Sequence, residues 1–409
     1  MDTIRLGISG RRIWIITIFA VLVRVFVVVA SGDNIHTIED FRIASNLAEG
    51  HGFSFDLLLG PTAYKAPAYP AVLAGIMLIV GVSATPIVTA VLQAIIGGLS
   101  VVMMHRIVRL LTTSETAALG AAALLALHPS YIVYPRVLEP TLWTVALSMI
   151  VFLALQQRQW VRAGIVSGLV VLFQPVAIGV LLVLAAIHLR RSWGPVVTIV
   201  CCAALVILPW TLRNAIVFGR FIPVKSPVWM NVYEGFLPEN SGLQEPFVHD
   251  SIITSIDTLR KNVNDVDMES HYRTIATKAI SDNPLGYGQR VLNAALRLWS
   301  FPPRYDMKIT IGFFIIRLLP VVFLMILTLI TFRTAWNLYP VLMRSILVVF
   351  LVVTATYALT HAANIRFKLD IEWLQILVIA LGATGLHSFG QRLSNKPWMH
   401  QVIDRKHLR

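Results

Sequence analysis

The sequence has 409 residues, of which 56% are hydrophobic and 13% are charged. A soluble domain carries about 25% charged residues, so this composition excludes a soluble globular chain. The formal net charge is +13, but the basic residues gather at the ends of apolar runs, as they do in the cytoplasmic loops of membrane proteins. The charge therefore indicates a membrane and not a nucleic acid, and the expected fold class is an all-α polytopic membrane protein.

Basic residues also set the predicted orientation. Arg11 and Arg12 precede the first apolar run, which places the N-terminus in the cytoplasm. The later basic groups, including the tail 392–409, are placed on the same side, and each apolar run is near the roughly 20 residues that a spanning helix needs. Both termini are then cytoplasmic, with about ten crossings. They are expected at 13–31, 85–105, 115–135, 139–156, 161–174, 176–189, 193–212, 311–332, 341–360 and 371–389.

The apolar stretch 69–81 is an exception to this pattern. It is short for a crossing, and counting it as one would place Arg106 and Arg109 outside the cell. We therefore expect a short helix that lies in the outer leaflet without crossing the membrane.

Two segments of this single transmembrane domain, 1–409, are expected outside the membrane. The first, 31–84, contains the surface helix and is acidic. The second, 213–310, is long enough to hold structure of its own. Within it, Pro284 is expected to begin a helix, and apolar residues from Val291 to Trp299 recur at the spacing of an amphipathic surface helix. The acids of the first segment are Asp33, Glu39, Asp40, Glu49 and Asp56.

Four stretches of the sequence occur in an order that is also found in a known family, and all four fall on the predicted outer face. They are 39–53 leading into 61–70, His128-Pro129 to Glu139, 208–214 with Phe218-Gly219, and Arg366-Phe367-Lys368 to Glu372. Together they resemble the GT-C membrane glycosyltransferases, in the bacterial branch that includes protein O-mannosyltransferases and the aminoarabinose transferase of lipid A. The resemblance covers nearly the whole chain. Two departures are the order Glu39-Asp40, where the family often has Asp-Glu, and Gln174, where many relatives carry Arg.

The resemblance implies an enzyme in a bacterial inner membrane that takes a sugar from a polyprenyl-phosphate carrier. The acceptor is a hydroxyl on the extracytoplasmic face, in a glycan, a lipid or a protein, and the reaction is inverting. Such a reaction requires a carboxylate base, cations at the departing phosphate, and an apolar groove for the lipid tail. We expect membrane lipid as a partner, no nucleic acid and no cofactor.

The candidate bases are Asp40, Glu39 and Asp33, in that order. The alternative interpretation of each acid taken singly is a solvated acidic loop. The resemblance of this loop to the catalytic loop of the family favours one of the three as the base.

The candidate phosphate-binding residues are Arg213 and Arg366, with Lys65 as a further choice. Both arginines are expected at the outer membrane surface, where an arginine fork matches phosphate oxygens. The alternative is that they reach toward lipid headgroups. We expect the two guanidinium groups to approach one another.

Other residues expected near the same cavity are Arg24, Arg136, Glu139 and Tyr64. Arg24 lies within the first span, so it is expected to face the protein interior and to pair there, with Glu139 as one candidate partner. The histidines match no metal-binding spacing, so no metal ligands are assigned, and dependence on a divalent metal stays open.

Two other kinds of protein remain open as interpretations. A transporter or flippase of lipid-linked glycans is also polytopic, but it typically has two similar halves, which are not found here. An O-antigen ligase or polymerase also has a large outer loop, but the stretch Pro209-Trp210 to Arg213-Asn214 is not expected in it.

Overall fold

The computed structural model describes residues 2–32, 34–37, 39–189, 193–236, 254, 258–259, 262–300, 311–360 and 365–394. The described chain is almost entirely helical, which confirms the expected class. The exception is a short antiparallel hairpin formed by β1 (Ser54–Asp56) and β2 (Gly60–Pro61).

Within the described residues, five helices are long and apolar enough to cross a membrane. A sixth results if α5 (Glu115–Leu127) and the following helical segment Pro129–Arg136, bent by 54°, form one span. The expectation of about ten crossings is therefore not confirmed. The five long helices are α1 (Asp2–Ala30), α4 (Thr85–Leu111), α10 (Trp193–Phe218), α16 (Leu319–Leu338, with the π-helical turn Phe314–Leu318 before it) and α17 (Pro340–Thr360).

Several shorter apolar helices pack among these long ones. The stretch expected to lie in the outer leaflet forms α3 (Ala68–Val80), whose 13 residues span only about 20 Å. That length agrees with a helix that does not cross, and its place in the leaflet stays a prediction. The others are α7 (Thr141–Gln156), α8 (Trp160–Phe173) and α9 (Ala177–Leu189), and the last helix is α18 (Ile365–Ser394).

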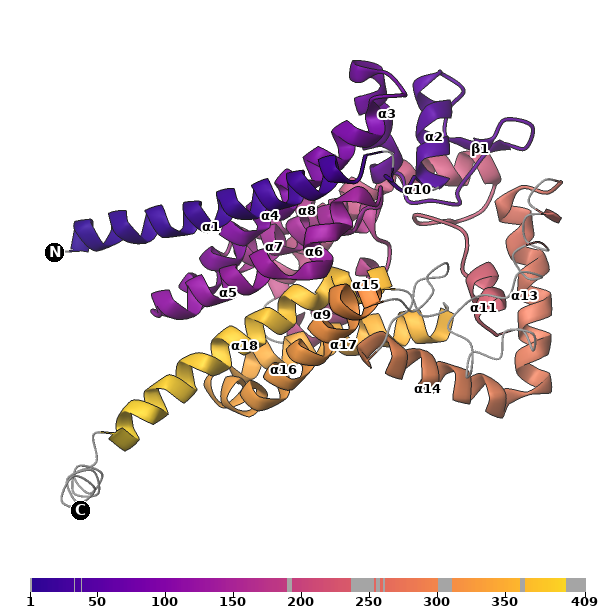
Figure 1. The fold of residues 1–409 in the computed structure, drawn as a ribbon. Helices are drawn as coiled ribbons and strands as arrows, with labels where there is room; N and C mark the ends of the chain where they lie inside the picture. The colour runs from indigo at the N-terminus through magenta and orange to yellow at the C-terminus, as the bar shows by residue number, and fades with distance from the viewer. Residues whose placement is uncertain are drawn as a thin grey trace, which may run out of the picture.

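The two ends of the bundle differ. Figure 1 shows that α1 begins and α18 ends at one end, whereas the helices of the two predicted outer segments gather at the other. This arrangement agrees with the predicted topology, although the membrane side of each end stays a prediction. The gathered helices are α2 (Glu39–Ala48), α11 (Trp229–Phe236), α13 (Asp265–Asp282) and α14 (Pro284–Ser300), and the short α15 (Ile311–Phe313) follows them in the chain.

Helix α14 begins at Pro284, as the sequence predicts. Arg290 and Leu298 are buried on one face, whereas Leu292 and Leu296 are 61% and 60% exposed on another. An exposed row of leucines is suited to an apolar environment, so the amphipathic character that the sequence predicts is present.

Close helix contacts depend on glycines. A Cβ atom at Gly168 of α8 would lie 2.7 Å from Val206 Cβ and 2.8 Å from the Ala203 carbonyl oxygen of α10. Similarly, a Cβ at Gly382 of α18 would lie 2.3 Å from the Thr331 carbonyl oxygen of α16. Only glycine permits backbones to approach this closely, as in other membrane helix pairs.

The side chain of Arg24, on α1, reaches the C-terminal end of α5. Its side chain is fully buried, and it donates to the carbonyls of Leu125 and Ala126 at 3.1 Å. The Leu125 carbonyl has no helical N–H partner because the residue four positions later is Pro129, which carries no N–H. Arg24 therefore faces inward as predicted, but the partners in its hydrogen bonds are carbonyls and not Glu139.

Candidate active site

The first turn of α2 carries the two adjacent candidate bases. Acidic residues are favoured at this position because the N-terminal end of a helix is partly positive. Asp40 is buried, with 4% of its surface exposed, whereas the side chain of Glu39 is 34% exposed. Lys65 Nζ lies 3.2 Å from Glu39 Oε2 and 3.4 Å from Asp40 Oδ2. We call Glu39, Asp40 and Lys65 the acid cluster.

The segment that carries Lys65 is fixed by both predicted outer segments. Arg213 donates to the carbonyls of Thr62 and Phe53, at 2.9 and 3.3 Å. Asp265, at the start of α13, accepts from the Thr62 hydroxyl at 2.9 Å and from the Ala63 N–H at 3.0 Å. A residue some 200 positions away in the sequence therefore holds the segment just before Lys65.

Arg213 is therefore linked to the acid cluster through the segment that precedes Lys65, to which it donates hydrogen bonds. Its guanidinium also lies over the rings of Trp210 and Phe218, at 4.8 and 5.3 Å from their centroids. In this structure Arg213 positions the first outer segment, and its role at a phosphate stays a prediction. Tyr64 neighbours the cluster directly, since Lys65 Nζ lies 5.5 Å from its ring centroid.

A second layer of polar residues joins α3 and α4 to the segment after α6 (Pro129–Val133). The Tyr69 hydroxyl donates to Gln93 Oε1 at 2.9 Å, and Gln93 Nε2 donates to the carbonyls of Pro135 and Val137. His36 forms a parallel bridge to Val137, so the chain just before α2 is held by the same segment. This segment therefore fixes the backbone just before the acid cluster.

Glu139 and Arg136 belong to this second layer. Glu139 is 9% exposed and accepts a hydrogen bond from the Tyr134 hydroxyl. The Arg136 carbonyl accepts from the His36 N–H at 3.0 Å. Both residues therefore lie on the segment that supports the acid cluster, and whether their side chains reach a substrate stays a prediction.

Two predicted site residues have no described side chain. Asp33 lies outside the described residues, and the side chain of Arg366, near the start of α18, also lies outside the described part of the chain. The expected approach of Arg213 and Arg366 therefore stays a prediction.

A separate group of charged side chains is buried where α18 meets α6. Glu372 Oε2 accepts from Arg317 Nη1 at 3.0 Å and lies 3.3 Å from His128 Nε2, while Lys368 Nζ lies 3.0 Å from Glu372 Oε1. Arg317 also donates to the Ser130 hydroxyl at 3.3 Å. All four titratable residues are at most 4% exposed. We call His128, Arg317, Lys368 and Glu372 the buried ion network.

Further polar contacts extend this network. The Tyr131 hydroxyl donates to the Leu369 carbonyl at 2.6 Å, and Gln174 Nε2 donates to Asp370 Oδ2 at 2.8 Å. Gln174, which departs from the family resemblance, thus joins the end of α8 to α18. The segment from His128 to Glu139 contacts the buried ion network at its beginning and the second layer of the acid cluster at its end.

Sequence reasoning found only part of the buried ion network. His128, Lys368 and Glu372 belong to stretches that carry the resemblance, but they were assigned no role. Arg317 was missed, although an arginine within the predicted span 311–332 is itself a signal, because a charge inside a span is costly unless it is paired. The spacing of four between Lys368 and Glu372 is a second signal, since such residues face one another on a helix.

Metal ligands do not converge in the part of the chain that the structure describes. Among those residues, no three His, Cys, Asp or Glu side chains come together in an arrangement that could hold a metal ion. The expected absence of a cofactor is not tested by this observation.

The arrangement of apolar helices described above is that of a GT-C glycosyltransferase fold. One solved structure with this fold is the apo form of the Archaeoglobus fulgidus oligosaccharyltransferase, to which the chain is similar with a TM-score of 0.52 and 14% sequence identity. The alignment covers 93% of this chain and 52% of that one, so the chain spans about half its length. The GT-C fold expected from the sequence is thereby confirmed. No family model and no curated protein matches the chain.

Proposed function

We propose that this protein is an inverting glycosyltransferase that moves a sugar from a polyprenyl-phosphate carrier to an acceptor hydroxyl on the extracytoplasmic face. The observation that carries the proposal is the acid cluster. A buried carboxylate, Asp40, lies within 3.4 Å of a lysine in a chain with a GT-C fold. The family resemblance assigns catalysis to the same loop.

The proposed reaction is a single displacement. The acceptor oxygen attacks the anomeric carbon of the donor sugar and forms the new glycosidic bond, while the bond from that carbon to the phosphate oxygen breaks. The proton of the acceptor hydroxyl passes to the Asp40 carboxylate, and the polyprenyl phosphate leaves with the bonding electron pair. Attack from the side opposite the leaving group inverts the anomeric centre. A positioned carboxylate base contributes typically 10²–10⁴-fold to such a step.

Lys65 is suited to the leaving phosphate. Its ammonium group already bridges Glu39 and Asp40, so a donor phosphate that binds beside it would lie close to the base. Proximity of this kind lowers the barrier because the reacting groups are held in place before the reaction. Arg213 and Arg366 are proposed as further cations for the donor.

The donor carrier is an apolar lipid, so the enzyme must admit it from the bilayer. The sugar is a hexose or a pentose, and the acceptor is a glycan, a lipid or a protein in the predicted extracytoplasmic space. The proposed location is a bacterial inner membrane, with both termini in the cytoplasm.

Mass spectrometry of membrane lipids and glycans tests the proposal whichever molecule is the acceptor. Cells with the protein, without it, and with the Asp40→Asn variant are compared. We expect one species that is shorter by one sugar in cells without the protein and in the variant. If every glycan is fully built in all three but accumulates on one side of the membrane, the protein is a transporter of lipid-linked glycans instead.

A further inference from the structure

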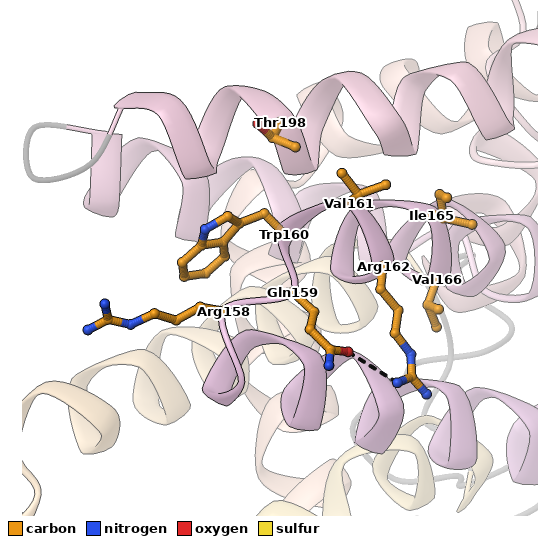
Figure 2. Close-up of a pocket in the computed structure, with 8 residues that line it drawn as sticks. All are labelled: Arg158, Gln159, Trp160, Val161, Arg162, Ile165, Val166 and Thr198. Atoms are coloured by element: carbon orange, nitrogen blue, oxygen red, sulfur yellow. Dashed lines mark hydrogen bonds between the residues drawn. The ribbon is translucent and has the colours of Figure 1, made fainter.

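An open surface cavity of about 690 Å³ lies at the turn between α7 and α8 (Figure 2). The residues that line it include two arginines, a tryptophan and several apolar side chains, and none of them is acidic. They are Arg158, Gln159, Trp160, Val161, Arg162, Ile165, Val166 and Thr198.

This cavity is separate from the acid cluster. It lies at the beginning of α8, whereas Phe173 at the end of that helix stacks on Trp143 and belongs to the same hydrophobic cluster as Tyr69 of α3. The 14 residues of α8 place the two ends about 20 Å apart. In the predicted orientation, the cavity therefore lies in the cytoplasmic leaflet.

The two arginines supply positive charge on the surface of the cavity. Both side chains are exposed, and Arg162 Nη1 donates to Gln159 Oε1 at 3.1 Å. Figure 2 shows Arg158 extending away from the turn on the other side of Gln159, next to Trp160. Guanidinium groups match phosphate oxygens, and tryptophan is favoured at the level of lipid headgroups.

The part of the cavity formed by α8, apart from Arg162, is apolar and partly exposed. Val161 and Ile165 are 55% and 44% exposed on α8. A Cβ atom at Gly164 would lie only 2.7 Å from the Ile199 carbonyl oxygen, so α8 and α10 are in close contact here and Thr198 forms the opposite wall. An acyl chain that runs along α8 would cover these exposed apolar side chains.

We infer that this cavity binds an anionic phospholipid of the surrounding leaflet. The Arg162 guanidinium contacts the phosphate, and the Arg158 guanidinium, on the other side of Gln159, adds to the positive charge that attracts the headgroup. Trp160 lies beside the headgroup, and one acyl chain follows Val161 and Ile165. The choice of an anionic lipid follows from the charge of the lining, which contains two cations and no acid. Basic pockets between helices on the cytoplasmic side are suited to anionic headgroups.

Native mass spectrometry of the full chain, released from detergent with phosphatidylglycerol or phosphatidylcholine, tests this inference. We expect the protein to retain one phosphatidylglycerol in preference to phosphatidylcholine. The double variant Arg158→Gln/Arg162→Gln should bind phosphatidylglycerol about 30-fold more weakly, from roughly fivefold for each basic residue, with phosphatidylcholine unchanged.

Two further variants are controls, one for loss of folding and one for a general effect of positive charge. Arg158 has a φ of 57°, a conformation that glycine adopts more easily, so Arg158→Gly removes the guanidinium while relieving the backbone. This variant should melt no earlier than the unmodified protein and yet bind phosphatidylglycerol more weakly. Arg11→Gln/Arg12→Gln removes two exposed arginines of α1, which do not line this cavity, and should leave that binding unchanged.

Two results would overturn the inference. One is an equal loss of phosphatidylglycerol in the α1 variant, which would mean that any basic residue attracts the lipid. The other is displacement of the bound lipid by millimolar inorganic phosphate together with unchanged binding in Ile165→Gln, which would mean that the cavity holds a free phosphate and no acyl chain.

Discussion

Single residues determine how the two groups of charged side chains are stabilised. In the acid cluster one lysine is shared by two carboxylates, of which Asp40 is nearly inaccessible. In the buried ion network one carboxylate, Glu372, is shared by two cations and a histidine. Each shared residue compensates charges that would be costly to bury alone.

Lys65→Met tests the coupling in the acid cluster. The variant leaves two adjacent carboxylates without their shared cation, and we expect the free energy of unfolding to fall by about 2–4 kcal/mol. In an Asp40→Asn background the same change should cost less, because the buried charge is already gone. Thermal unfolding of the four proteins in detergent gives the coupling energy.

Arg42→Met is the matched control for this cycle. Arg42 pairs with Asp56 at 3.2 Å on the surface, with 56% of its side chain exposed, so its loss should cost less than about 1 kcal/mol. A Lys65 variant as mild as this control would show that the acid cluster is not coupled in the folded protein.

Glu372→Gln tests the buried ion network. It leaves Arg317 and Lys368 buried without their shared carboxylate, and a loss of about 3–5 kcal/mol is expected in detergent-based unfolding. The control is Glu115→Gln, because Glu115 pairs with Arg109 at a more exposed site and should matter much less. Similar losses in the two variants would contradict a special role for the network.

The sequence allows the acid cluster to be predicted better than the buried ion network. Glu39, Asp40 and Lys65 lie within one loop that resembles a catalytic loop, so local sequence carries the information. The buried ion network joins positions 128, 317, 368 and 372, and only the packing of α18 against two other elements brings them together. A charge within a predicted span and a spacing of four indicate that Arg317, Lys368 and Glu372 are paired, but they do not indicate which distant residues meet.

At the scale of helices, the outer segments are joined by polar contacts to helix ends. Glu269 of α13 accepts from the N–H groups of Val228, Trp229 and Met230, at 2.9–3.0 Å, and so caps the first turn of α11. Burial raises the pKa of the Glu269 carboxyl from its usual value of 4.5, although these N–H groups act in the opposite direction.

This raised pKa predicts a pH effect on α11. Between pH 4.5 and the higher pKa of the folded state, the folded protein binds more protons at Glu269 than the unfolded chain does. The contribution of Glu269 to stability is therefore complete below about pH 4.5 and is lost as the pH rises through the folded pKa.

Hydrogen–deuterium exchange of residues 229–236, corrected for the intrinsic rate at each pH, measures this effect. Protection should fall as the pH rises in the native protein, whereas Glu269→Gln should show no such dependence because its amide does not titrate. Equal pH profiles for the two proteins would show that Glu269 does not control the docking of α11.

Glycine contacts between helices give a further test at this scale. Gly168→Ala forces a Cβ atom against the backbone of α10, and overpacking of this kind costs about 1–3 kcal/mol. Gly120→Ala in α5 is the control, since no atom lies within 4 Å of its added Cβ, and alanine is the better helix former. Thermal unfolding should separate the two variants, and equal melting temperatures would mean that α8 and α10 adjust freely.

Considered as a whole, the molecule has its apolar helices where hydropathy predicts them. The positions of the apolar helices agree with the expected runs to within a few residues at most boundaries. The number of crossings does not follow from the sequence, because α7, α8 and α9 are shorter than a full span and α5 is interrupted at Pro129. Apolar composition indicates burial in lipid or protein, but helix length and bending depend on packing.

The central claim is sugar transfer with the carboxylate of Asp40 as base. The most direct measurement is the release of polyprenyl phosphate from a panel of labelled polyprenyl-phosphate sugars, in proteoliposomes supplied with extracted membrane glycans and lipids as acceptors. We predict release with the native protein, a fall of about 10²–10⁴-fold in Asp40→Asn with the donor still bound, and little change in Glu49→Gln on the exposed end of the same loop. Full activity in Asp40→Asn, Glu39→Gln and Asp33→Asn alike would contradict the account and direct attention to Glu139.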